Sequence, residues 1–244
     1  MLINSVIMFL RELLPALLLL STVLVWQRAR LRPLLAVLAP LAALGLVLLS
    51  GQYTWLSGAL DGLGLEFFYL CCYVLCFVLL LAAVVCQRQR QVAAMLSGAA
   101  VAALLWVNGS NLVLFLFVYE RQWFQQPGLW LGVILGLGIG LSVAVLWHYL
   151  LRELTRWRGV LTLVLALLAT RQLTMAAALA LQSDWIPAGP VLWNSQQWLS
   201  EQSEYGYFFN ALLGYEASPA LAQCVAFGLG LLLMIWQGRR LEVQ

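Results

Sequence analysis

The first hydrophobic stretch of the chain reads Ser5-Val-Ile-Met-Phe-Leu-Arg11-Glu12-Leu-Leu-Pro15-Ala-Leu-Leu-Leu-Leu-Ser-Thr-Val-Leu-Val-Trp26. A membrane-spanning helix needs about 20 predominantly apolar residues, and this stretch meets that length. Arg11 and Glu12 nevertheless lie side by side within it. A charge at the centre of a membrane helix costs about 2.5–3.5 kcal/mol on insertion scales. We therefore expect this pair either to have partners inside the protein or to take part in its function.

The composition of the whole chain indicates a membrane protein. Of its 244 residues, 64% are hydrophobic and 9% are charged. Soluble domains average about 45–50% apolar and about 25% charged residues. A soluble chain of this length could not bury so much apolar surface in one core. We predict an all-α, polytopic membrane protein whose helices satisfy their own backbone hydrogen bonds.

The apolar runs predict seven transmembrane helices in a single transmembrane domain over residues 1–244. The spans cover approximately 5–27, 33–51, 63–86, 92–118, 128–150, 159–182 and 218–236. The longest connection, over about 183–217, precedes the last helix. It is rich in tryptophan, phenylalanine and tyrosine, which suits a surface at the edge of a membrane.

The arginines predict how the bundle is oriented. All thirteen basic residues are arginine, and most follow the odd-numbered spans: Arg28, Arg30, Arg32, Arg88, Arg90, Arg152, Arg156, Arg158, Arg239 and Arg240. Basic residues collect on the cytoplasmic side of membrane proteins. We therefore predict an N-terminus outside, a C-terminus in the cytoplasm and an outer loop over 183–217. No basic patch interleaved with aromatic residues indicates a nucleic-acid partner.

A weak internal repeat links the first and fourth spans. The segment 10–19 aligns with 106–115, so that Glu12 corresponds to Asn108 and Pro15 to Asn111. We predict a 3+3 inverted repeat over about 5–86 and 92–182, followed by a final helix. Transporters of this build bind substrate near the bilayer midplane, on interrupted helices from the two halves. Pro15 and Gly109 are the expected interruptions.

Four local motifs carry a resemblance to a known family. They are Phe9-Leu-Arg-Glu12, Gly64-Leu-Glu66, Val113-Leu-Phe-Leu116 and Leu212-Leu-Gly-Tyr-Glu-Ala-Ser-Pro219. With the predicted topology, they resemble the oxidase-dependent iron permease family over nearly the whole chain. That family has the pattern Arg-Glu-x-x-Glu in spans one and four, with the glutamates as iron ligands. The resemblance implies a permease in the cytoplasmic membrane of a bacterium, with iron as substrate and no permanently bound cofactor.

The same resemblance implies partners. Besides the lipid bilayer, it implies periplasmic metal-binding or electron-transfer proteins that dock on the outer loop over 183–217.

The chain departs from the family pattern at most of the ligand positions. Pro15 stands where the second glutamate of the first motif belongs. In the fourth span, Val107, Asn108 and Asn111 replace the arginine and both glutamates. Asn108 and Asn111 still share a helical face and offer two uncharged amide oxygens. Hard cations prefer several oxygen ligands. One carboxylate, that of Glu12, predicts a weaker, transient site or a less highly charged cation.

The predicted ion pathway therefore consists of Glu12, Asn108 and Asn111. Glu66, near the outer end of the third span, is expected to act as a further ligand or relay. Arg11 and Arg171 are the expected supporting charges, although Arg171 has no place in the family pattern. A structural alternative is that these four charged residues form ion pairs that lock helices together.

Other functions stay open from the sequence. The chain is also compatible with a non-transporting membrane subunit of a metal-handling complex. A third possibility is a channel or transporter for another solute, in which Arg11 and Arg171 bind an anion. Cys72 and Cys76 share a helical face and have the softness that Cu(I) prefers, but cysteine packs more commonly as a small apolar residue. We do not expect an enzyme, because no nucleophile-base pair is present.

Overall fold

A computed structural model describes residues 2–27, 31–118, 127–187, 189–200, 203, 205–206, 209–210 and 214–242. The long helices in these ranges are α1 (Leu2–Gln27), α2 (Leu31–Gly58), α3 (Gly64–Val85), α4 (Arg90–Val118), α5 (Pro127–Glu153), α6 (Arg158–Gln182) and α8 (Leu221–Glu242). Each overlaps one predicted span and begins within three residues of its predicted start. Over the described ranges the only pairing of extended backbone is an isolated bridge between Val191 and Ala220. The predicted all-α class is confirmed.

Six helices are long and apolar enough to cross a membrane: α1, α3, α4, α5, α6 and α8. The chain therefore has the architecture of a multi-pass membrane protein. In α2, the apolar stretch found within the described residues is Leu31–Gly45, which is shorter than a full span although the helix itself has 28 residues. A seventh span at α2 stays a prediction.

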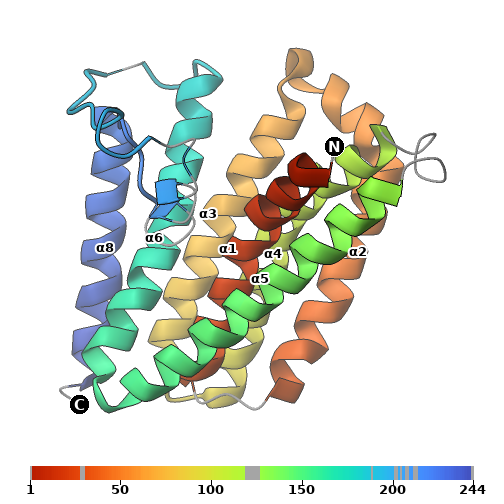
Figure 1. The fold of residues 1–244 in the computed structure, drawn as a ribbon. Helices are drawn as coiled ribbons and strands as arrows, with labels where there is room; N and C mark the ends of the chain where they lie inside the picture. Colours follow the sequence, from red (N-terminus) through yellow and green to blue (C-terminus); the bar gives the residue numbers. More distant parts are fainter. Residues whose placement is uncertain are drawn as a thin grey trace.

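The helices run alternately up and down (Figure 1). The turns after α3 and after α5 emerge at the end of the bundle where the chain finishes, and the N-terminus lies at the other end. Arg88, Arg152 and Arg156 therefore share one end of the molecule, as the arginine pattern predicts. Arg28, Arg30 and Arg121 lie outside the described residues.

The expected interruptions at Pro15 and Gly109 are wrong. The helix α1 continues through Pro15, and α4 continues through Gly109. A proline inside a helix removes one backbone hydrogen bond but does not always break the helix, because neighbouring helices can hold it in place. The bond removed is the one that the carbonyl of Arg11 would otherwise accept. Pro15 thus leaves an extra backbone acceptor beside Glu12.

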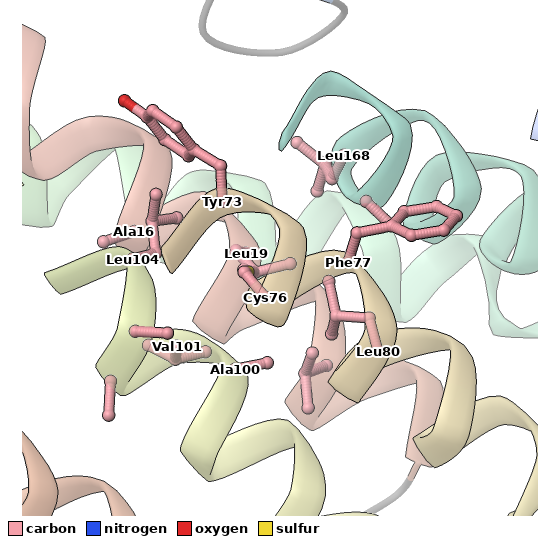
Figure 2. Close-up of a cluster of buried hydrophobic side chains, with 14 of the residues drawn as sticks. Ala16, Leu19, Tyr73, Cys76, Phe77, Leu80, Ala100, Val101, Leu104 and Leu168 are labelled. Carbon is pink, nitrogen blue, oxygen red and sulfur yellow. The ribbon is translucent and has the colours of Figure 1, made fainter. Parts of the chain in front are cut away.

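The core lies among α1, α3, α4 and α6, where α1 and α3 both pack against α4 and against α6. Its side chains include Leu19, Cys76, Leu80, Leu104 and Leu168, each at most 2% exposed (Figure 2). Cys72 lies in the same cluster. Packing of Cys72 and Cys76 among leucine, valine and alanine side chains supports the structural interpretation of these cysteines.

Small residues bring α1 and α5 into close contact. Gly132, Gly136, Gly140 and Ala144 follow one another at intervals of four on α5. A Cβ atom at Gly136 would lie 2.8 Å from Cβ of Phe9 on α1, which is closer than such atoms approach. Helices in membranes associate through such stripes because lipid gives no hydrophobic driving force between them. The Ser21 hydroxyl adds a hydrogen bond to the Ala144 carbonyl at 3.2 Å.

The outer loop folds back on itself before α8 begins. Leu192 N–H donates to the Pro219 carbonyl at 3.1 Å, and Ser195 N–H donates to the Ala217 carbonyl at 2.7 Å. At the start of α8, the side-chain oxygen of Gln223 accepts from the Ala220 N–H at 2.7 Å, which caps the helix. These bonds tie residues 191–195 to the approach to α8, so this part of the loop has a defined position beside the start of α8.

Candidate functional site

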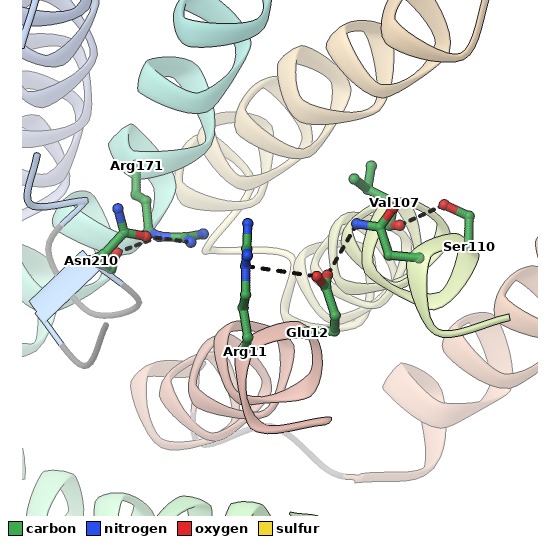
Figure 3. A network of polar contacts seen from close by, with 7 residues as sticks. Arg11, Glu12, Val107, Ser110, Arg171 and Asn210 are labelled. Carbon is green, nitrogen blue, oxygen red and sulfur yellow. Dashed lines mark hydrogen bonds and ion pairs between the residues drawn. The ribbon is translucent and has the colours of Figure 1, made fainter. Parts of the chain in front are cut away.

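Glu12 is buried where α1 crosses α4. Only 7% of its surface is exposed. Its Oε2 accepts a hydrogen bond of 3.2 Å from Nδ2 of Asn111 on α4 (Figure 3). A buried carboxylate is costly unless polar groups surround it. The contact therefore joins the two helices that the sequence pairs through the internal repeat.

The ion pair between Arg11 and Glu12 lies within α1 and does not join two helices. Nε of Arg11 lies 3.9 Å from Oε1 of Glu12, and the Arg11 side chain is 66% exposed. Neighbouring residues on a helix point in different directions, so the two side chains do not face each other. This pair lies within one helix and does not hold two helices together.

Arg171 reaches from α6 to the outer loop. Its Nε donates to the Asn210 carbonyl at 2.6 Å, and a terminal nitrogen donates to Oδ1 of the same residue at 3.2 Å. Asn210 in turn donates its side-chain amide to the Tyr215 carbonyl at 2.9 Å. Gly214 lies against Arg171 with a φ of +67°, a conformation that glycine adopts without strain. Arg171 thus anchors Asn210, and through it Tyr215, to the bundle.

The guanidinium of Arg171 also acts electrostatically on Glu12, as does that of Arg11. Figure 3 shows the three charged side chains in a row, with Arg11 between the other two. Tyr73 of α3, 7% exposed, lies within electrostatic range of both Glu12 and Arg171. The row contains one carboxylate and two guanidinium groups, so its formal charge is about +1. The role of Arg11 and Arg171 as supporting charges stays a prediction.

The two asparagines of α4 occupy different environments. Asn111 presents its amide nitrogen, rather than its oxygen, to Glu12. Asn108 is 6% exposed, one turn earlier on the same helix. Between them, the Ser110 hydroxyl is 2.6 Å from the hydroxyl of Tyr69 on α3. Asn111 therefore stabilises the charge of Glu12 in this arrangement.

Glu66 lies apart from this row of charges. It opens α3, and one of its carboxylate oxygens is buried with no hydrogen-bond partner among the described residues. Glu66, Tyr69 and Tyr73 recur at intervals of three and four and share one face of α3. At 1.5 Å per residue, Glu66 is about 10 Å along the helix from Tyr73. The structure thus aligns Glu66 with the site but does not bring it to Glu12. The alternative that the four charged residues form helix-locking ion pairs does not describe Arg171, because its guanidinium donates to Asn210 in the outer loop.

Sequence reasoning missed four polar residues of the site. Tyr69 and Tyr73 could have been found, because they follow Glu66 on one face of a helix. Ser110 lies between Asn108 and Asn111, and its position was also visible. No sequence pattern pointed to Asn210, because only the fold of the loop brings it to Arg171.

The described residues limit the chemistry of the site. In the part of the chain that the structure describes, no three His, Cys, Asp or Glu residues gather in a way that would hold a metal ion. The polar groups that act on the Glu12 carboxylate are the amide of Asn111 and the guanidinium groups of Arg11 and Arg171. This set can hold a hydrated or weakly coordinated solute, but it gives no closed cage of anionic ligands.

Comparison of the chain with protein-family models, with curated proteins and with solved structures finds no match.

Proposed function

We propose that this chain is an integral membrane permease whose solute passes the site formed by Glu12, Asn108 and Asn111 on α1 and α4. The single observation that carries the proposal is the buried carboxylate of Glu12, hydrogen-bonded across the helix interface to Asn111. Ionisable groups inside a membrane bundle are costly and mark solute paths or proton relays. Their position between two helices is where small-molecule sites of bundles form.

The packing of the helices supports an inverted repeat of α1–α3 and α4–α6. A two-fold relation that exchanges α1 with α4, α2 with α5 and α3 with α6 requires that α1–α5 and α2–α4 be equivalent contacts. Both contacts are extensive. The same relation maps the α1–α4 and α3–α6 contacts onto themselves, and both of these occur. The substrate site of such a repeat lies on its axis, between α1 and α4, where Glu12 meets Asn111.

In line with the family resemblance, we propose iron or a related metal cation as the solute. A single carboxylate gives weak binding, and a pathway needs binding weak enough to let the ion leave. Asn111 releases Glu12 and turns its oxygen toward the ion, while the exposed Arg11 side chain moves away. Glu66 serves as the outer relay, because its buried oxygen lacks a partner among the described residues.

The proposed setting is the cytoplasmic membrane of a bacterium, with the outer loop on the periplasmic side. Trp193 and Trp198 of this loop are 52% and 92% exposed. Exposed tryptophans are common anchors of protein interfaces. They suit docking of a periplasmic metal-binding or electron-transfer protein.

Metal uptake into proteoliposomes tests the proposal. The purified chain, reconstituted in one direction, should take up ferric, ferrous or another metal ion with saturable kinetics, and protein-free liposomes should not. Uptake indistinguishable from protein-free liposomes for all metals would contradict it.

A second function, that of a non-transporting subunit, has one observation in its favour. Glu12 and Arg171 are each already bonded to a neighbour, Asn111 and Asn210 respectively, as in a structural network. A subunit of this kind would co-purify with partner proteins from native membranes and would give no uptake alone. The uptake assay and the co-purification together separate the two functions.

A further inference from the structure

A cavity of about 820 Å³ opens at the basic end of the bundle. Its lining comes from the last turn of α1, the turn between α3 and α4, the start of α6 and the α8 residue Gly238. Along α1, Glu12 and Val25 are separated by about 20 Å at 1.5 Å per residue. The cavity is therefore distinct from the Glu12 site, and nothing in the proposed function uses it.

The lining is positively charged from several sources. Arg88, Arg90 and Arg156 line the cavity, and no carboxylate is among the described residues that do so. Arg90 is also the first residue of α4, and Gly159 lies in the first turn of α6. Neither helix has an acidic residue in its first turn. Helix N-termini carry about half a positive charge and favour anions. The arginines and the two helix N-termini therefore favour binding of an anionic group in this cavity.

The inner wall adds polar and apolar groups. Gln27 donates to the Ala93 carbonyl at 3.0 Å and also to Ser97, which leaves its side-chain oxygen buried without a partner among the described residues. That oxygen can accept a hydrogen bond from a hydroxyl or an amine. Val25 and Leu161, both buried, form an apolar floor. The cavity thus suits a ligand with an anionic group, a hydrogen-bond donor and an apolar part.

We propose that this cavity binds a phosphoryl group, with Arg90 and Arg156 as its principal donors. The planar fork of arginine matches phosphate oxygens in pairs, and charge-assisted bonds of this type are the strong ones. The group can belong to the head of an anionic phospholipid or to a free phosphate compound. Basic pockets between transmembrane helices bind lipid head groups in this way.

Lipid retention and thermal unfolding test the proposal on the full chain. Native mass spectrometry of the chain released from bilayers of mixed phosphatidylglycerol and phosphatidylcholine should show retained phosphatidylglycerol. Arg90→Gln with Arg156→Gln should weaken the apparent affinity about tenfold, as expected for the loss of charge-assisted bonds. The matched control is Arg32→Gln with Arg152→Gln, which removes two exposed arginines near the same end that do not line the cavity. The control should retain lipid as the parent chain does.

A second variant leaves every charge in place. Gly159 lines the cavity and a Cβ there meets nothing within 4 Å, so Gly159→Phe should fold and should displace the ligand by filling space.

In a parallel arm, inorganic phosphate is added to lipid-free protein in neutral detergent. A rise in Tm with phosphate alone would identify a free phosphate compound as the ligand of the cavity. A rise only with phosphatidylglycerol would identify the lipid as the ligand. No response to either ligand, or equal retention in both double variants and in Gly159→Phe, would overturn the proposal.

Discussion

At the scale of single residues, Glu12 and Arg171 are charged side chains buried inside the bundle, and each is bonded to an asparagine. Glu12 and the polar face of α4 could be predicted from the sequence, because charged and amide residues are conspicuous within apolar runs. The partner of Arg171 could not be predicted, because Asn210 is 39 residues away in an irregular loop. Which side of Asn111 faces Glu12 also depends on the folded geometry. Sequence reasoning expected its oxygen, whereas the structure presents its nitrogen.

The Arg171–Asn210 contact gives a prediction about the outer loop. Asn210→Ala removes a side chain that accepts a bond from Arg171 and donates one to the Tyr215 carbonyl. We expect the free energy of unfolding to fall by about 1–3 kcal/mol, because the guanidinium of Arg171 loses one of its two acceptors and the Tyr215 carbonyl loses its donor. Limited proteolysis should cleave residues 195–215 faster. Thermal unfolding in detergent and the cleavage rate measure the two effects.

Asn194→Ala is the matched control for that variant. Asn194 is exposed in the same loop, and its side chain accepts only a local bond from the Gln196 N–H at 3.0 Å among the contacts described. The control should unfold and be cleaved as the parent chain is. Identical behaviour of the two variants would contradict the role of Asn210 as an anchor.

At the scale of helices, the apolar runs predicted the positions of all seven long helices, because a membrane helix must be both long and apolar. The expectation that Pro15 and Gly109 interrupt helices failed. Helix propensity is a weak signal when neighbouring helices hold the backbone in place. The interval of four between the small residues of α5 was present in the sequence, but only the structure identifies α1 as the helix that they contact.

The α1–α5 contact gives a prediction about packing. Gly136→Leu inserts a side chain where even a Cβ atom would lie 2.8 Å from Cβ of Phe9. Overpacking of this kind costs about 1–3 kcal/mol or more, so Tm in detergent should fall. Gly138→Leu is the control, because a Cβ at Gly138 meets nothing within 4 Å. A Tm for Gly136→Leu equal to that for Gly138→Leu would refute the close contact.

At the scale of the whole molecule, the segments that carry Arg88, Arg152 and Arg156 lie at one end of the bundle. The positions of the arginines in the sequence were sufficient to predict this grouping. The inverted repeat was suggested only weakly by the sequence, because leucine aligns with leucine easily. Its support comes from the exchange of packing partners between α1–α5 and α2–α4. Which end faces the cytoplasm is a prediction that rests on the positive-inside rule.

Cysteine labelling tests that orientation. In intact cells, a membrane-impermeant maleimide should label Asn194→Cys, in the outer loop, and should not label Glu153→Cys, at the basic end. Both residues are exposed. The parent chain, with its five native cysteines, sets the background. Labelling of Glu153→Cys but not of Asn194→Cys would reverse the orientation.

Uptake of metal by Glu12→Gln in proteoliposomes tests whether Glu12 lies on the path of a transported cation. Glutamine keeps the size of the side chain and can still accept the Asn111 bond, so the variant loses charge but not packing. Glu153→Gln, an exposed carboxylate on the last turn of α5, is the matched control. We predict at least a tenfold loss of the uptake rate in Glu12→Gln, an unchanged Tm and parental uptake in Glu153→Gln. Parental uptake in a folded Glu12→Gln protein would contradict the account.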